Sequence, residues 1–253
     1  MIDKDTDFTR SPIRWWGNKL RLYRQTKFTH YFPPATHYAE PFMGGLSVFL
    51  NLKYRPRHAA FNDLNGELVN FWSVVRNHQS ELEAKLKYQW PGVHDEPGDD
   101  PIQRAAVFFL DNQNSGRFIG GLEYTKQFEV WAKLMDESSV SVSCMDAIKF
   151  IHQLDGASWL IYADPPYPGT DNEYGFTCDP HELYQALDDR VNSTSHPVVW
   201  VVSINEIESA PQDAHVIDLG ILSKAKMADR HEYLVSNVEL KKEEKSSSET
   251  RLF

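Results

Sequence analysis

The stretch Trp159-Leu160-Ile161-Tyr162-Ala163-Asp164-Pro165-Pro166-Tyr167 decides the fold of this chain. Its first half is a run of apolar and aromatic residues, which predicts a buried strand that stops at Asp164. A proline has no N–H to donate, and it keeps the preceding residue out of the helical region. Ligands of open α/β sheets bind at the carboxyl ends of the strands. The stretch therefore predicts a rigid ligand-binding turn that carries a carboxylate, backbone carbonyls and an aromatic ring.

This turn has the groups that suit a planar amine. The carboxylate of Asp164 and the carbonyl of Pro165 can each accept one hydrogen of an NH2 group, and the ring of Tyr167 can stack on a base. The string Asp-Pro-Pro-Tyr resembles the signature of amino-group methyltransferases, in particular DNA N6-adenine methyltransferases. The resemblance implies that Asp164, Pro165, Pro166 and Tyr167 are the catalytic turn. Taken alone, the four residues also fit a surface turn after a core strand.

The overall composition is that of a globular protein. With 253 residues the chain can form one large core, with or without an inserted subdomain. No apolar run approaches the roughly 20 residues of a membrane span, and residues 1–7 lack the apolar core of a signal peptide. Cys144 and Cys178 have no metal-ligand spacing. We therefore expect a cytoplasmic protein of a bacterial or phage-infected cell, without a membrane segment or a bound metal.

The charge is distributed unevenly along the chain. Residues 1–58 contain 10 Lys/Arg and 4 Asp/Glu, a net charge of +6, so the remainder carries −16 of the total of −10. A local basic field is what contact with phosphate requires, and a solvated helix face is the alternative. Six basic side chains and no acidic one occur between positions 10 and 27. They are Arg10, Arg14, Lys19, Arg21, Arg24 and Lys27.

The amino-terminal motif is Trp15-Trp16-Gly17-Asn18-Lys19, followed by a helix-like run with Leu20 and Tyr23 on one face. Gly-Asn before a helix permits close approach of a ligand to free N–H groups. The string resembles the W-x-G-[GN]-K motif of Dam-type adenine methyltransferases. The resemblance implies that Trp15 and Lys19 help to hold S-adenosylmethionine. Core packing of the two tryptophans is the alternative.

A glycine turn follows a short strand predicted at residues 36–39, and residues 47–52 have the pattern of an amphipathic helix. A glycine without Cβ lets a ligand approach the backbone at such a turn. The string Pro41-Phe42-Met43-Gly44-Gly45-Leu46-Ser47-Val48 resembles the family's cofactor loop P-F-x-G-[GA]-G-S-V, with Leu46 in place of the last glycine. The resemblance assigns cofactor contacts to Glu40, Phe42, Gly44, Gly45 and Ser47.

Two more acidic residues follow predicted strands. Asp63 ends the strand at 58–61, about 20 residues past the glycine turn, where an acid is placed to bind ribose hydroxyls. Its context resembles the family's [NA]-D-x-N, although Asp63 also suits the N-cap of a helix expected at 64–76. Asp146 follows the strand at 140–143 and matches the family acid that binds the cofactor's adenine amine, with Ala147 replacing a phenylalanine. The resemblance also counts Asp164 among the cofactor contacts.

The cofactor pattern is interrupted by residues 77–138, which we interpret as an inserted target-recognition subdomain. Within it, turn-rich acidic loops precede a helix at 102–110 and a polar, glycine-rich segment at 111–121. Amide and arginine side chains are the types that read adenine and guanine edges, and a structural loop is the alternative. The predicted DNA contacts are Arg21, Arg24, Asn112, Asn114 and Arg117.

The remaining pattern completes an α/β fold. Strands are expected at 197–203, 215–220 and 232–240, and residues 230–237 resemble the family's closing R-x-E-x-L-x-x-N. We predict a Rossmann-like methyltransferase sheet with an antiparallel carboxyl-terminal hairpin. Its catalytic domain would comprise residues 1–76 and 139–240, and the charged residues 241–253 would form a disordered tail.

Four motifs in the Dam-like order imply a phage-type, site-specific DNA N6-adenine methyltransferase. It would use S-adenosylmethionine, act on a flipped adenine of duplex DNA with GATC as the family's commonest target, and work as a monomer, with a DNA-induced dimer left open. One alternative is an amino-methyltransferase on cytosine N4, RNA adenine or glutamine. Asp164 disfavours cytosine N4 and glutamine, whose enzymes begin the motif with serine and asparagine. The other is a catalytically silent DNA-binding relative.

Overall fold

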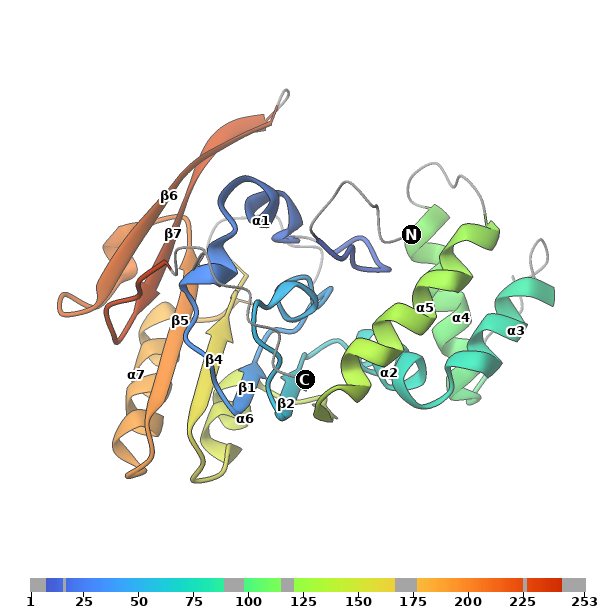
Figure 1. The fold of residues 1–253 in the computed structure, drawn as a ribbon, viewed down its shortest axis with the longest axis horizontal. Coiled ribbons are helices and arrows are strands. Elements are labelled where there is room, and N and C mark those ends of the chain that lie inside the picture. The colour runs from blue at the N-terminus through green and yellow to red at the C-terminus, as the bar shows by residue number, and fades with distance from the viewer. Residues whose placement is uncertain are drawn as a thin grey trace, which may run out of the picture.

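The computed structural model describes residues 8–15, 17–88, 98–114, 121–166, 177–224 and 227–242. Within these ranges, a seven-stranded sheet has helices on both faces (Figure 1). The strands are β1 (His37–Glu40), β2 (His58–Asn62), β3 (Ser139–Ser143), β4 (Trp159–Ala163), β5 (Val198–Ile204), β6 (His215–Lys224) and β7 (Met227–Ser236). The α-helices are α1 (Leu20–Thr26), α2 (Gly66–Asn77), α3 (Gln79–Tyr88), α4 (Pro101–Asn114), α5 (Gly121–Asp136), α6 (Ala147–Gln153) and α7 (Pro180–Asn192).

The strand order is β3-β2-β1-β4-β5-β7-β6. Strands β1 to β5 are parallel, and β7 is antiparallel to both β5 and β6. This is the predicted Rossmann-like methyltransferase sheet with its carboxyl-terminal hairpin, and the fold class is confirmed. The five parallel strands all end at one edge, so residues that follow them along the chain meet there in space.

The alternation of side chains along β4 explains why this strand reads as one apolar run. Leu160 and Tyr162 pack in the core on one face of the sheet, and Ile161 and Ala163 pack in the core on the other. Helices cover both faces of a parallel sheet, so both sets of side chains are buried. Helices α6 and α7 contribute to the second core, and α1, α2, α4 and α5 contribute to the first.

Helices α2 to α5 stand together at the end of the molecule away from the β6–β7 hairpin (Figure 1). Their aromatic side chains, among them Phe109 and Trp131, belong to the same hydrophobic core as Tyr162 of β4. The amino-terminal segment is fastened to them, since Trp131 Nε1 donates a hydrogen bond to the Arg10 carbonyl at 2.8 Å. The predicted insertion at 77–138 thus shares its core with the sheet, and its boundaries as a recognition subdomain stay a prediction.

The prediction of a helix at residues 47–52 is wrong. Only a short 3-10 turn, η2 (Phe49–Asn51), forms there. Side chains take the carbonyls that an α-helix would use: Asn51 Nδ2 donates to the Ser47 carbonyl, and the Arg55 guanidinium donates to the carbonyls of Phe49 and Leu50. The amphipathic pattern is satisfied because nearly every residue of this turn is buried.

The ends of one helix and one strand also differ from the sequence prediction, and one helix was not predicted. Helix α4 runs to Asn114, into the segment expected to be a loop, and α5 was not predicted at all. Strand β7 ends at Ser236, and not at Leu240. The Asn237 side chain ends the pairing by accepting from the Trp200 amide at 2.9 Å and donating to the Val198 carbonyl at 3.0 Å.

None of the helices in the described ranges combines the length and the apolar character needed to cross a membrane. Among the same residues, no cluster of three His, Cys, Asp or Glu side chains could hold a metal ion.

Candidate active site

Asp164 lies immediately after the carboxyl end of β4, in an ion pair with Lys19. The distance from Lys19 Nζ to Asp164 Oδ1 is 2.8 Å, and the Lys19 side chain is only 5% exposed. The Glu232 carboxylate of β7 lies 3.8 Å from the same ammonium and accepts a hydrogen bond from the Ser203 hydroxyl of β5. Four segments that are distant in sequence thus meet at this edge of the sheet.

The backbone around Lys19 is fixed by local hydrogen bonds. The Lys19 amide donates to Ser47 Oγ at 3.2 Å, and Asn18 Oδ1 accepts from the Leu20 amide at 2.9 Å, where α1 begins. Ser47, predicted to contact the cofactor, thereby links the amino-terminal motif to the glycine turn. Lys19 is the one member of the predicted basic cluster that is buried, so it belongs to the candidate site beside Asp164 and not to the basic surface.

The glycine turn after β1 is closely packed. A Cβ on Gly44 would lie 2.7 Å from Cδ1 of Trp15, so the indole ring rests directly on this part of the backbone. Trp72 Nε1 donates to the Gly44 carbonyl at 3.0 Å. Leu46, in place of the family's last glycine, has a φ of 50° and is fully buried. A side chain in this left-handed region costs roughly 1 kcal/mol, so the turn keeps its glycine-like shape despite the substitution.

Asp63 lies beside the glycine turn and is not the N-cap of α2. Its Oδ2 accepts from the Gly44 amide at 3.1 Å, and its Oδ1 accepts from the Asn65 amide at 3.0 Å. Burial raises the pKa of Asp63, while these backbone hydrogen bonds act in the opposite direction. The N-cap is Asn65, whose Oδ1 accepts from the Leu68 amide at 3.0 Å. The capping interpretation of Asp63 was wrong because the helix begins two residues later than expected.

Glu40 is the last residue of β1 and is 2% exposed. Its Oε1 accepts from the Tyr38 hydroxyl at 2.7 Å and from the Phe49 amide at 3.0 Å. Burial raises the pKa of Glu40 to about 8, although both hydrogen bonds act in the opposite direction. The charge of Asp164 contributes to the rise. Near neutral pH Glu40 is therefore mostly protonated and ties β1 to η2.

Asp146 and Phe42 lie at the same carboxyl edge of the sheet, on the face that α6 and α7 cover. Asp146 caps α6 by accepting from the Lys149 amide at 3.0 Å, and its side chain is exposed. Phe42 is half-buried against the core formed with α6 and α7. Pro165 and Pro166 continue the turn after Asp164 and line a pocket of about 50 Å³ with residues of α7. Tyr167 lies outside the described residues.

The candidate DNA contacts fall in three different settings. Arg21 and Arg24 are exposed on α1. Asn112 forms a reciprocal pair with the Arg14 backbone, accepting from its amide at 2.7 Å and donating to its carbonyl at 2.8 Å. Asn114 ends α4, but its side chain lies outside the described part of the structure, as does Arg117. A base contact for any of these residues stays a prediction.

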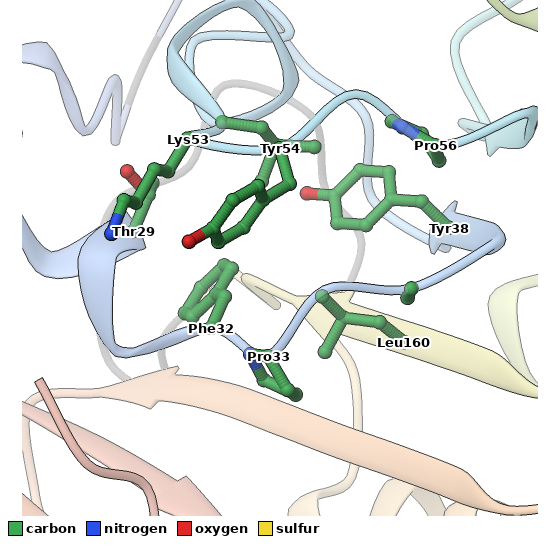
Figure 2. A pocket seen from close by; sticks show the side chains of 10 residues that line it. Thr29, Phe32, Pro33, Tyr38, Lys53, Tyr54, Pro56 and Leu160 are labelled. Atoms are coloured by element: carbon green, nitrogen blue, oxygen red, sulfur yellow. The ribbon is translucent and has the colours of Figure 1, made fainter. Parts of the chain in front are cut away.

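A second pocket, shown in Figure 2, lies near the amino ends of the strands. Tyr38 and Leu160, the second residues of β1 and β4, face Phe32 and Tyr54 across it (Figure 2). Its volume of about 10 Å³ is at the lower limit, roughly 10–15 Å³, of what a single water molecule needs. The carboxyl edge with Asp164 is therefore the better candidate for chemistry.

A family model described as D12 class N6 adenine-specific DNA methyltransferase matches residues 15–97. These residues contain the amino-terminal motif, the glycine turn and Asp63, which the structure brings together beside Asp164. The matched part of the chain is similar to this class. This similarity agrees with the family resemblance of the motifs, and the roles of Trp15 and Lys19 stay predictions.

Individual relatives carry matching names. A DNA N-6-adenine-methyltransferase of Escherichia phage P1 is 27% identical over 68% of this chain, which spans about a quarter (26%) of that protein's length. The type II methyltransferase M1.LlaDCHI of Lactococcus lactis subsp. cremoris is 24% identical over 74% of this chain and 76% of its own. A DNA adenine methylase of Escherichia coli K12 is 24% identical over 66% of this chain and 68% of its own.

Sequence reasoning missed three contributors to the site. Glu232 stands inside the closing R-x-E-x-L-x-x-N string, but nothing in that string pairs it with Lys19. Ser203 reads as an ordinary buried strand residue, and Trp72 as an ordinary helix residue. Only the three-dimensional arrangement pairs Glu232 with Lys19, Ser203 with Glu232, and Trp72 with the Gly44 carbonyl.

Proposed function

We propose that this protein is a site-specific DNA N6-adenine methyltransferase of the D12 class. It moves the methyl group of S-adenosylmethionine to the exocyclic amine of an adenine that has been rotated out of the duplex. The observation that carries the proposal is the position of Asp164: it follows β4 directly, begins the Asp-Pro-Pro-Tyr turn, and is paired with a buried lysine.

The residues at the carboxyl edge fit S-adenosylmethionine by their chemistry. A nucleoside presents hydroxyl and amine donors, and Asp63 and Asp146 supply acceptors beyond the ends of β2 and β3. Trp15 supplies an aromatic face at the glycine turn. These residues would hold the cofactor, with Lys19, Phe42, Gly44, Gly45 and Ser47 shaping the site around them. When bound, S-adenosylmethionine supplies an electrophilic methyl group on a positively charged sulfur.

The role of the turn is to bind and orient the adenine amine. Asp164 and the Pro165 carbonyl accept its two hydrogens, which directs the nitrogen lone pair toward the methyl group, and Tyr167 stacks on the base. The ammonium of Lys19 at 2.8 Å favours the ionised form of Asp164. A hydrogen bond to an ionised acceptor is about twice as strong as one between neutral groups. Catalysis thus comes from positioning and from fixed charges that need no reorganisation.

DNA is the proposed partner, bound as a duplex by a monomer. Extrusion of the target base is required because its amine cannot be reached inside the stack. Arg21 and Arg24 are exposed near the active site and suit contact with phosphates. The predicted recognition subdomain at 77–138 would read the target sequence, for which GATC is the proposal. The protein would act in the cytoplasm of a bacterium or of a phage-infected cell.

The test is methyl transfer from tritiated S-adenosylmethionine to genomic DNA that lacks adenine methylation. We expect label in the DNA, and mass spectrometry of the digested nucleosides should identify N6-methyladenine. Sequencing of the modified positions would then give the recognition sequence. Label found in cytosine, in RNA or in protein would show that the substrate is not DNA adenine. Cofactor binding without transfer to any of these would indicate a catalytically silent relative.

A further inference from the structure

Residues 9–14, called the strap below, lead into the amino-terminal motif and are held by side chains of the predicted insertion at 77–138. At every second residue, a backbone carbonyl of the strap accepts a hydrogen bond from α4 or α5. The three bonds, each 2.8 Å long, run from Trp131 Nε1 to the Arg10 carbonyl, from Gln113 Nε2 to that of Pro12 and from Asn112 Nδ2 to that of Arg14. The insertion therefore fixes the path of the chain up to the motif.

The same segment also lies against the glycine turn. A Cβ on Gly45 would lie 2.9 Å from Ser11 Oγ, and one on Gly44 would lie 2.7 Å from Cδ1 of Trp15, the residue that follows the strap. The missing side chains of both glycines thus make room for the strap and for this indole. The Trp15 ring also contacts Phe108 of α4, with the ring centroids 6.5 Å apart. The strap and Trp15 together contact the insertion and the predicted cofactor turn at once.

Asn112 holds the end of the strap that adjoins Trp15. Its Oδ1 accepts from the Arg14 amide at 2.7 Å while its Nδ2 donates to the Arg14 carbonyl, so one side chain binds both backbone groups of one residue. A bidentate contact with an adenine edge would use the same amide oxygen and amide nitrogen. The neighbouring Gln113 is 3% exposed and lies under the Pro12 carbonyl, withdrawn from the surface. Both side chains are therefore engaged by the strap.

The strap has other attachments that do not depend on α4. At its far end, Asn51 forms the same kind of reciprocal pair with the backbone of Thr9, at 2.7 and 2.8 Å. Ile13, within the strap, is 2% exposed and belongs to the first core. Loss of Asn112 would therefore loosen only the end next to Trp15. Since the indole is only half-buried, its position over the glycine turn depends on the backbone that leads to it.

We propose that Asn112 and Gln113 are positioning residues for the cofactor. Through the backbone of the strap they hold Trp15 over the glycine turn, where its indole would contact S-adenosylmethionine. This inference rests on the proposed methyltransferase function, and it gives Asn112 a different role from the predicted base contact. A residue that reads a base changes the affinity for DNA or the target sequence. A residue that supports the cofactor site changes the affinity for S-adenosylmethionine.

The experiment compares the wild-type protein with Asn112→Ala and Gln113→Ala. We expect each variant to bind S-adenosylmethionine about 10-fold more weakly in calorimetry without DNA, since a hydrogen bond that orders the strap is lost. In methylation assays, KM for S-adenosylmethionine should rise about 10-fold while KM for DNA changes less than about 3-fold. The modified sequence should stay the same. Gln113→Ala separates the two roles, because a buried side chain under the strap does not read a base.

The matched control is Asn70→Ala. The Asn70 amide also donates to a backbone carbonyl, that of Pro101 at 2.9 Å, but at the end of α4 opposite to Asn112. Its cofactor affinity and both KM values should equal those of the wild type. Unchanged cofactor affinity in Asn112→Ala would overturn the inference, as would a change in KM for DNA alone. A lower melting temperature with wild-type cofactor affinity would equally overturn it, because the strap would then serve only the fold.

If Gln113→Ala does not fold, Asn112→Ala decides through its two KM values, since the Asn112 side chain is only half-buried.

Failure of the two proposals can be told apart. A wild-type protein that binds S-adenosylmethionine but methylates no DNA would refute the proposed function, and the affinities of the variants would still test the roles of Asn112 and Gln113. A wild-type protein that methylates adenine, with both variants equal to it in cofactor affinity, would refute only the positioning roles.

Discussion

Two neighbouring parallel strands, β1 and β4, bring carboxyl groups to the same edge of the sheet, and the two groups behave differently. Glu40 at the end of β1 accepts hydrogen bonds from two neutral donors, the Tyr38 hydroxyl and the Phe49 amide. Asp164 after β4 faces the ammonium of Lys19 at 2.8 Å. Burial raises the pKa of Glu40 to about 8, and the charge of Asp164 adds to that rise.

The comparison shows that the partner, and not the place in the fold, decides what a buried carboxyl group can do. Neutral hydrogen-bond donors do not offset the loss of hydration, so Glu40 keeps its proton and serves as a structural link. A cation at contact distance favours the ionised form, so Asp164 can accept strongly from a bound amine. The sequence strings around both residues match the same family, yet only one of them has the electrostatics of a catalytic group.

The largest effect is expected at Asp164. We predict that Asp164→Ala lowers the rate of methyl transfer roughly 1,000-fold or more, because the variant loses a preorganised charged acceptor. The fold should persist, since Asp164 lies beyond the end of β4 and the Glu232 carboxylate stays 3.8 Å from Lys19 Nζ. Tritium transfer and a thermal denaturation curve are the measurements. Near-normal methylation by this variant would break the distinction between Asp164 and Glu40.

The next effect concerns the cation that distinguishes the two carboxyl groups. In Lys19→Met, Asp164 and Glu232 lose their shared positive partner inside the protein. Removal of one partner of a buried ion pair typically costs 3–5 kcal/mol, so we predict destabilisation of about 3 kcal/mol. Chemical denaturation would measure it, and methyl transfer should fall about 100-fold because Asp164 loses the cation that lies 2.8 Å from its Oδ1. Lys241→Met, at a lysine beyond β7 whose side chain is 78% exposed, is the control and should leave both quantities unchanged.

Glu40→Gln tests the other half of the comparison. Its folded-state pKa of about 8 lies above the ordinary pKa of 4.5 for a glutamate, so the stability that protonated Glu40 contributes is full below pH 4.5. This contribution is lost as the pH rises through 8. Glutamine stays neutral, and its oxygen can accept from Tyr38 and Phe49. We predict that Glu40→Gln gains stability over wild type, by roughly 2 kcal/mol, between pH 5 and 9.

The measurement for Glu40→Gln is the melting temperature across this pH range, with methyl transfer at pH 7.5 staying within about 3-fold of wild type. A difference in melting temperature that does not change with pH would mean that Glu40 is ionised throughout. In that case the two strand ends would not differ as described.

The smallest effects separate a ligand-binding acid from a helix cap. If Asp63 binds the ribose of the cofactor, Asp63→Asn should weaken S-adenosylmethionine binding about 10-fold, since one charge-assisted hydrogen bond is lost. Asn65→Ala should instead lower stability by about 1 kcal/mol, because the N-cap of α2 is lost, without changing cofactor affinity. Calorimetry and urea denaturation measure the two. An Asp63→Asn protein with normal affinity would assign Asp63 to the glycine turn alone.

The sequence predicted the strands well where the chain is apolar on both sides. Residues 159–163 and 197–203 read as continuous buried runs because a parallel sheet covers both faces of each strand. It failed at residues 47–52, where the periodicity fits a helix but the side chains of Asn51 and Arg55 take the carbonyls. It also failed to predict α5, where tertiary packing around Phe128 and Trp131 provides the stability.

The sequence by itself determined the Asp-Pro-Pro-Tyr turn, the glycine turn and their order, because prolines, glycines and an acid at the end of a strand act through local geometry. Tertiary structure alone decided that Lys19 pairs with Asp164, that Glu232 shares this lysine, and that Glu40 is held by neutral donors. Such pairings join residues from different strands and from the amino terminus. Their electrostatics depend on distance and burial, which no local pattern of residues records.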